Sequence, residues 1–196
     1  MKKWLPLIII VVIIIGIFRW GVGLNNTMVE KQETARTQWA NVESAYQRRS
    51  DLIPNLVNTV KGYADFEKET LEGVIQARAN ATKTTIDPSN ITPEQMAQFQ
   101  ESQNSLSGAL SRLMVVVERY PDLKANQNFL ELQSQLEGTE NRINVERNRY
   151  NTVARDYNVY IKKFPASVVA GFLNFDEMAL FKAAEGSEKA PEVNFN

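Results

Sequence analysis

The sequence of 196 residues contains no histidine and no cysteine. These two absences exclude a Ser-His-Asp or Cys-His catalytic pair and zinc held by histidine or thiolate. They also exclude a ferritin-type di-iron centre, which takes a Glu-x-x-His motif from two helices, and any disulfide or lipid-modified cysteine. Neither a glycine-rich phosphate loop nor a metal-ligand spacing is present. We therefore expect no enzymatic activity, no cofactor and no metal site.

A large excess of charge of one sign is also lacking. The formal net charge is −1, and without Lys2, Lys3 and Arg19 of the N-terminal segment the rest of the chain holds 19 basic and 23 acidic residues. Nucleic-acid-binding domains present a clustered basic face, which this distribution does not provide. We therefore expect no nucleic-acid partner. The length is sufficient for one domain.

What the sequence does contain is an uncharged apolar run over residues 5–18, with a tryptophan on either side. Tryptophan at both ends is typical of the interfacial belts of a membrane span. As a helix, the stretch between the tryptophans rises roughly 24 Å, less than a hydrocarbon core of about 30 Å. Extension to residue 24, with Arg19 snorkelling to the headgroups, closes the gap. We predict a membrane anchor over residues 1–24, whose span includes Trp4, Leu5, Ile10, Ile15, Phe18 and Trp20.

Two aspects of this segment have alternatives. A cleaved secretory signal is the competing interpretation, with Gly21-Val22-Gly23 as a weak cleavage site. Lys2 and Lys3 favour a cytoplasmic N-terminus and hence a body on the non-cytoplasmic side. The basic residues on the other flank, Arg19, Lys31 and Arg36, oppose this orientation.

Apolar residues continue at helical spacing through most of the remaining chain. One stripe runs in phase from Trp39 to Ala77 and crosses Pro54, which predicts a single long helix that is kinked at the proline. A break, with Ser50 or Asp51 as the N-cap of a new helix, is the alternative.

Two further long helices are predicted after a loop at residues 82–92. The first opens with a capping box formed by Thr92 and Gln95 and ends at Pro121; the second ends at Pro165. A short apolar helix is expected to cap the bundle after this proline. The predicted fold is therefore all-α. An N-terminal transmembrane helix precedes an elongated antiparallel up-and-down bundle of three long helices and a short C-terminal one, over residues 25–184, with a flexible tail over residues 185–196.

The unequal lengths of the predicted helices indicate a stalk next to the membrane. The second bundle helix covers only the distal half of the first, which leaves residues 25–52 as a lone helix. Trp39, Val42 and Tyr46 share one face of this stalk, and a lone helix cannot bury them. We therefore predict that neighbouring copies associate through these three residues.

Polar residues near the proline predict a structural corner. In the predicted bundle, Arg49 and Pro54 lie beside the turn that carries Glu118 and Asp122, where an ion pair from Arg49 would hold the corner together. A ligand or phosphate clamp is the functional alternative. A row of asparagines on the third long helix is compatible with a solvated face, a buried polar network or an inter-subunit contact: Asn141, Asn144, Asn148 and Asn151.

Several of these segments together resemble the LemA family, membrane-anchored bacterial helical proteins. The central signature is RRSDLIPNLVNTVKGY at residues 48–63, and QWANVE, EKETL, YPDLKAN, LEGTENRI and RNRYN accompany it at residues 38–43, 67–71, 120–126, 136–143 and 147–151. The resemblance covers most of the chain. It implies a single-pass anchor in the bacterial inner membrane, an antiparallel four-helix body and no known catalytic residues.

The expected function is that of a non-enzymatic, self-associating scaffold or adaptor at the membrane. Its expected partners are the lipid bilayer, further copies of the chain and other membrane proteins. The alternative is a membrane-tethered sensor that binds a small ligand or peptide in or on the bundle, which would need a cavity with convergent polar groups.

Overall fold

The computed structural model describes residues 4–63, 67–88 and 91–182. In this part of the chain it has six helices and no strand, which confirms the predicted all-α class. The helices are α1 (Leu5–Lys61), α2 (Lys68–Lys83), α3 (Pro93–Val117), α4 (Pro121–Lys124), α5 (Gln127–Lys162) and α6 (Ala166–Leu173). The tail for which we predicted flexibility, residues 185–196, lies outside the described residues.

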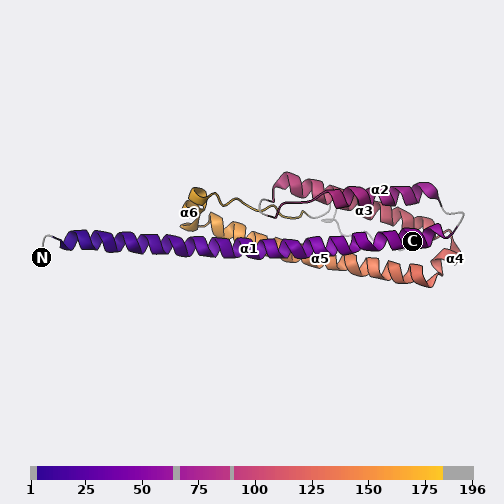
Figure 1. Ribbon diagram of the computed structural model, residues 1–196, viewed down its shortest axis with the longest axis horizontal. Coiled ribbons are helices and arrows are strands. Elements are labelled where there is room, and N and C mark those ends of the chain that lie inside the picture. The colour runs from indigo at the N-terminus through magenta and orange to yellow at the C-terminus, as the bar shows by residue number, and fades with distance from the viewer. Residues whose placement is uncertain (1–3, 64–66, 89–90, 183–196) are drawn as a thin grey trace, which may run out of the picture.

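One helix, α1, leads without a break from the apolar run into the bundle (Figure 1). Its 57 residues rise roughly 86 Å. The large apolar side chains from Leu7 to Trp20 are exposed, whereas Met28 and Ala35 farther along the helix are fully buried. The apolar run is long and apolar enough to cross a membrane. The same helix therefore supplies both a candidate anchor and a wall of the body.

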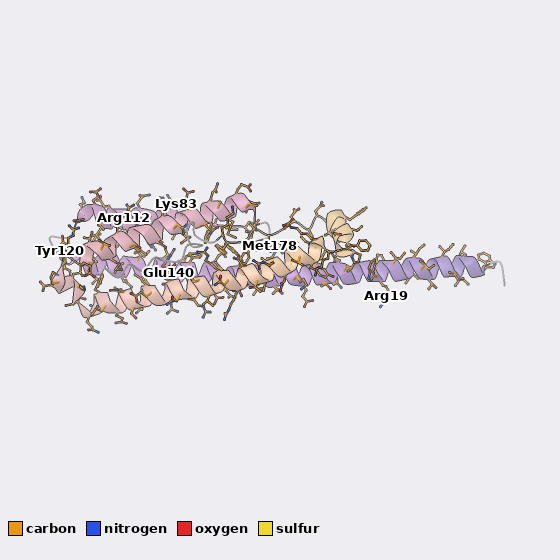
Figure 2. All side chains as sticks on the ribbon, turned by 180° about the vertical axis from the view of Figure 1, so that it is seen from behind. Arg19, Lys83, Arg112, Tyr120, Glu140 and Met178 are labelled. Atoms are coloured by element: carbon orange, nitrogen blue, oxygen red, sulfur yellow. The ribbon has the colours of Figure 1, made fainter. Side chains whose placement is uncertain are left out.

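The body runs away from the apolar run and back again. α2 turns back along α1, α3 runs outward, and α5 returns beside α1 (Figure 1). At the far end, the Tyr63 hydroxyl donates to the carbonyl oxygen of Asp122 over 3.3 Å and accepts from Nδ2 of Asn126 over 3.1 Å. In Figure 2, Tyr120 marks the far end of the body, and Arg19 lies on the lone part of α1 beyond its other end.

The predicted start of α3 is confirmed. The backbone N–H of Gln95 donates to Oγ1 of Thr92, and the N–H of Thr92 donates to Oε1 of Gln95, both over 3.2 Å. This reciprocal pair satisfies two N–H groups that the first turn of a helix leaves without partners.

The predicted path of the chain is wrong in one respect. The helix expected to continue to Ala77 ends at Lys61, and a new helix begins after Glu67, which is the N-cap of α2. The apolar stripe keeps its phase across this break, so its periodicity does not reveal it. Because α2 reverses the direction of the chain, α5 runs toward the apolar run. It covers the part of α1, residues 25–52, that we predicted to be a lone stalk.

The interior has two apolar clusters along the long axis. The distal cluster joins α1, α2, α3 and α5 around residues such as Leu56, Val74 and Leu113. The proximal cluster lies nearer the apolar run and contains Trp39, Tyr150 and Phe181. Its walls are α1 and α5, the first turns of α3, and a segment that follows α6. The proximal half therefore depends on chain that has no regular secondary structure.

Pro54 lies inside α1, which confirms the predicted continuous helix and rules out a break at Ser50 or Asp51. Proline has no N–H, so the carbonyl of Ser50 loses its helical partner. The structure supplies a replacement, because Nε of Arg78 on α2 donates to the Ser50 carbonyl oxygen over 2.8 Å. The proline thus creates an acceptor that fastens α2 to α1.

Replacing Arg78 with methionine should therefore destabilise the protein only while Pro54 is present. A hydrogen bond from a charged donor is worth about 1.5–3 kcal/mol, and Pro54→Ala restores the internal donor that makes Arg78 dispensable. Urea unfolding of the full chain in detergent, for the two single variants and the double variant, measures this coupling. Arg112→Met, at an exposed arginine of α3, is the control. An Arg78→Met effect of the same size in both backgrounds would contradict the pairing.

Candidate functional site

The candidate site is a groove that holds the chain's own extended segment. Residues 174–182 follow α6 without helical structure and return along the bundle; we name this segment the strap. Asn174 turns the chain, with φ 57° and ψ 48° in the left-handed region, which asparagine tolerates better than most residues. The N–H of Phe175 donates to the carbonyl of Ala170 over 3.0 Å, which closes the end of α6.

A repeated Tyr-Asn pair on α5 binds the strap through its backbone. Nδ2 of Asn158 donates to the carbonyl of Met178 over 2.8 Å, and Oδ1 of Asn158 accepts from the Met178 N–H over 2.9 Å. Asn151 forms the same two bonds with Phe181, over 3.0 and 2.9 Å. The preceding tyrosine of each pair donates its hydroxyl to a strap carbonyl: Tyr150 to Ala179 over 2.8 Å and Tyr157 to Asp176 over 3.0 Å.

The Tyr-Asn repeat fits because seven residues of α5 and three residues of the strap span the same distance. Seven residues of α-helix, from Asn151 to Asn158, rise roughly 10.5 Å. Three residues of extended chain, from Met178 to Phe181, cover roughly 10 Å. A helix with a seven-residue repeat can therefore contact every third residue of an extended polypeptide laid against it.

The opposite wall of the groove also contacts the strap backbone. The N–H of Ala179 donates to the carbonyl of Ile91 over 3.1 Å. At the end of the strap, Nε2 of Gln100 on α3 and Nη2 of Arg147 on α5 each donate to the carbonyl of Lys182 over 3.2 Å. Backbone contacts of this kind depend little on the side chains of the bound segment.

Two strap side chains, three residues apart, are buried in the groove. Met178 and Phe181 are 5% and 6% exposed. The Phe181 ring stacks on Trp39 with a centroid separation of 5.6 Å and meets Tyr150 edge-on at 5.7 Å. The guanidinium of Arg147 lies 4.6 Å from the centroid of the same ring, a favourable cation–π arrangement. The groove thus combines backbone binding with two apolar sites.

The tyrosines of the groove remain hydrogen-bond donors at neutral pH. Burial raises the pKa of Tyr150 well above the ordinary value. Burial, and next the nearby carboxylate of Asp176, raise the pKa of Tyr157 to about 12, against a small opposing effect of Arg36. A raised tyrosine pKa means that the folded state favours the protonated form. Both hydroxyls therefore stay available to the strap carbonyls.

A second polar cluster lies between the two apolar clusters. The guanidinium of Arg49 is 2% exposed. It donates to Glu140 and Ser107 over 2.8 Å each and to Oε1 of Gln103 over 2.7 Å. Gln103 in turn donates to the carbonyl of Ala81, in the last turn of α2, over 3.2 Å. The cluster joins all four long helices of the body. Nη1 and Nη2 of Arg49 are bonded within the protein, as in a structural contact, whereas its buried Nε has no hydrogen-bond partner among the described residues.

The predicted corner is therefore wrong. Arg49 does not pair with Glu118 or Asp122, because the reversal at Glu67 puts those residues at the far end of the body. There Glu118 pairs with Lys124, and Pro54 and Arg49 lie closer to the middle. The ion pair that Arg49 does form is with Glu140, labelled midway along α5 in Figure 2.

The predicted oligomer contact is also wrong as assigned. Trp39 and Val42 are fully buried and Tyr46 is 7% exposed within a single copy. Trp39 meets the rings of Phe99 and Tyr150 at centroid distances of 5.4 and 5.3 Å, in addition to Phe181. The three residues do require a cover, as the sequence indicates, but α5, α3 and the strap provide it.

Sequence reasoning missed the groove, although a signal for it exists. Asn141, Asn144 and Asn148 are exposed, as a solvated face predicts, but Asn151 belongs to the groove. The informative pattern is the Tyr-Asn pair at residues 150–151 and 157–158. The described residues bring no group of three acidic side chains together that could hold a metal ion. What the groove can do chemically is bind an extended polypeptide.

The fold and the groove together define a class: an all-α protein with one apolar helix that continues into an elongated body carrying a polypeptide groove. Comparison with known proteins gives its family. The chain belongs to the LemA family, whose model matches residues 38–195, so the resemblance seen in the sequence is confirmed.

Individual relatives agree with this assignment. The chain is 27% identical to protein LemA of Metamycoplasma hominis over 179 residues, which cover 91% of this chain and 78% of that protein. It is 26% identical to magnetosome protein MamQ 2 of Paramagnetospirillum magneticum over 174 residues. It is 25% identical to magnetosome protein MamQ of Magnetospirillum gryphiswaldense over 173 residues. These two matches each cover 80% of this chain and 64% of the relative.

Proposed function

We propose that the chain is a non-enzymatic, membrane-anchored scaffold that self-associates by exchanging straps, with the strap of one copy in the groove of another. The observation that carries this proposal is the way the strap is held. It is bound as a separate peptide would be, through its backbone and the two side chains of Met178 and Phe181, by walls that belong to other elements.

Exchange preserves the contacts that hold the strap in the groove and gives up only the turn after α6, where the Phe175 N–H donates to the Ala170 carbonyl. A strap from a neighbouring copy forms the same bonds to Asn151 and Asn158, so the only change is in the turn at Asn174. Swapping an identical element in this way is a low-cost route to association. An anchor confines copies to two dimensions and raises their local concentration, which favours contacts between neighbours. The uninterrupted helix across Gly21 and Gly23 supports retention of the anchor.

The composition supports a role without catalysis. The chain has no histidine or cysteine, and the buried side chains of Arg49, Gln103 and Asn158 bond to other elements of the body. We also propose the bacterial inner membrane as the location and its non-cytoplasmic side for the body. Lys2 and Lys3 before the span are the basis for that orientation, against the basic residues that follow it.

A second candidate function is a sensor whose groove receives a peptide from another protein after the strap leaves. The backbone character of the contacts favours it, because a groove that binds backbone accepts more than one sequence. Such a peptide would need apolar side chains at two positions three residues apart, in place of Met178 and Phe181.

Cysteine cross-linking tests strap exchange directly, since the natural chain contains no cysteine. Ala179 and Ile91 share a backbone hydrogen bond of 3.1 Å. This bond places the two residues side by side, and cysteines whose Cα atoms are about 4.4–6.8 Å apart can form a disulfide. One tagged copy carries Ala179→Cys, a second copy with a different tag carries Ile91→Cys, and both are produced together. We expect oxidation of the membranes to link the two tags.

Three further variants make the result decisive. Pairing Ala179→Cys with Val115→Cys, at an exposed site on α3, measures random collisions. Adding Asn151→Ala and Asn158→Ala to the Ile91→Cys copy should lower the yield to that level. A single chain with both cysteines at 91 and 179 should lock and lose the ability to link. If the double-cysteine chain locks completely and the two singly substituted copies give no link between tags, exchange is overturned. A link from position 91 to a different protein would favour the sensor.

A further inference from the structure

α6 exposes an unusual amount of apolar surface. The segment from residue 164 to residue 175 contains no charged side chain. Phe164, Val168 and Phe172 recur every fourth residue and are 83%, 58% and 87% exposed, and Leu173 is 51% exposed. Small residues face the body instead, with Ala166 and Ala170 buried. Large apolar groups in water are unfavourable, so this face needs a cover that the body does not supply.

The position of α6 indicates what the cover is. α6 packs on α1 at the end of the bundle, where α1 emerges as a lone helix (Figure 1). The two helices enclose a groove of about 460 Å³, open to the outside. Phe18, Gly21 and Val22 line it from α1, and Val168, Val169 and Phe172 line it from α6. This surface is continuous with the apolar surface of the span.

The length of the apolar run also indicates that α6 lies at the membrane boundary. Between Trp4 and Trp20 the helix rises roughly 24 Å, and a hydrocarbon core is about 30 Å thick. The remaining thickness of roughly 6 Å corresponds to residues 21–24, and Gly21 and Val22 of this turn line the groove with α6. Basic side chains flank this level, with Arg19 on α1 and the exposed Lys163 just before Phe164. Lysine and arginine at this depth reach anionic headgroups.

We propose that α6 is a second membrane-contacting element. Its exposed face lies at the boundary between acyl chains and headgroups, and a lipid acyl chain fills the groove between α1 and α6. The occupant is the bilayer that the apolar run enters, so the proposal rests on the membrane anchor of the proposed function and is independent of strap exchange. The body then meets the membrane at two places, the span and α6.

Site-directed spin labelling of the full chain tests this contact. Single cysteines at Phe172→Cys, Val168→Cys, Ile10→Cys and Val115→Cys receive a nitroxide, and each protein is placed in vesicles of phosphatidylcholine and phosphatidylglycerol. Accessibility to oxygen, which concentrates in lipid, is compared with accessibility to a water-soluble nickel chelate. Val115 is the matched control, because it is a 70% exposed apolar residue near the far end of α3.

We expect positions 172 and 168 to resemble position 10, with high oxygen and low nickel accessibility, and position 115 to show the reverse. Labels at 172 and 168 in water, with the label at 10 in lipid, would overturn the contact by α6 and leave the anchor intact. All four labels in water would overturn the anchor as well. In a second measurement, a fluorophore replaces the nitroxide, and brominated acyl chains should quench its fluorescence at positions 172 and 10 but not at position 115.

Discussion

Replacing Trp39 with alanine should lower the free energy of unfolding by about 3–5 kcal/mol, the range for deletion of a large buried aromatic side chain. Trp39 is fully buried and contacts three other rings at centroid distances of 5.3 to 5.6 Å. Its removal leaves a cavity between α1, α5 and the strap. Urea unfolding of the full chain in detergent, followed by far-ultraviolet circular dichroism, measures the change.

Trp39→Phe is the matched control. Phenylalanine keeps an aromatic ring against Phe99 and Phe181 and leaves a smaller void, so its effect should be a minor part of that of alanine. The strap should also loosen in Trp39→Ala, because Phe181 loses its stacking partner. If Trp39→Ala left stability unchanged and altered only the oligomeric mass, the burial described here would be wrong and the surface predicted from the sequence would be correct.

Replacing Arg49 with alanine should destabilise the protein by about 3–5 kcal/mol. The change removes three charge-assisted hydrogen bonds, to Glu140, Ser107 and Gln103, and hydrogen bonds to charged groups contribute about 1.5–3 kcal/mol each before the remaining partners relax. It also empties the layer between the two apolar clusters. The same unfolding assay measures the result.

Two substitutions at the same position separate charge from geometry. Arg49→Lys keeps the charge but has a single ammonium in place of a planar fork, so it should recover only part of the loss. Arg49→Met fills most of the volume and leaves Glu140, which is 48% exposed, in contact with water. Full recovery by lysine would show that charge alone matters and would contradict the forked contact.

Much of the architecture could be predicted from local signals. The apolar run with its tryptophans marks the candidate span. Helix boundaries are marked by the capping box at Thr92 and by the prolines at 121 and 165. Each of these signals depends only on nearby residues. The continuous helix through Pro54 also followed from local periodicity. The compensating bond from Arg78 did not, since it comes from another helix.

The topology and the groove could not be predicted for a common reason. The break before Glu67 keeps the phase of the apolar stripe, so the reversal of α2 has no periodic signal. The strap has no helical or strand period of its own, and its partners Asn151, Asn158 and Ile91 are distant in sequence. The sequence shows that Trp39 must be covered, but not by what. Its cover depends on the direction of α5, which the sequence does not reveal. We therefore predicted a second copy of the chain as its partner.

The continuity of α1 has a mechanical consequence. From residue 24 to Lys61 the helix extends roughly 56 Å beyond the apolar run, with α5 packed along it and no break in α1 between the apolar run and the body. A transmembrane helix tilts on average by about 20° from the bilayer normal. A change of that size in the tilt of α1 would sweep the far end of the body sideways by roughly 19 Å. With the membrane anchor that we propose, the body would be a rigid lever, so that a small reorientation of α1 inside the bilayer gives a large displacement at the turn that carries Tyr63 and Asp122.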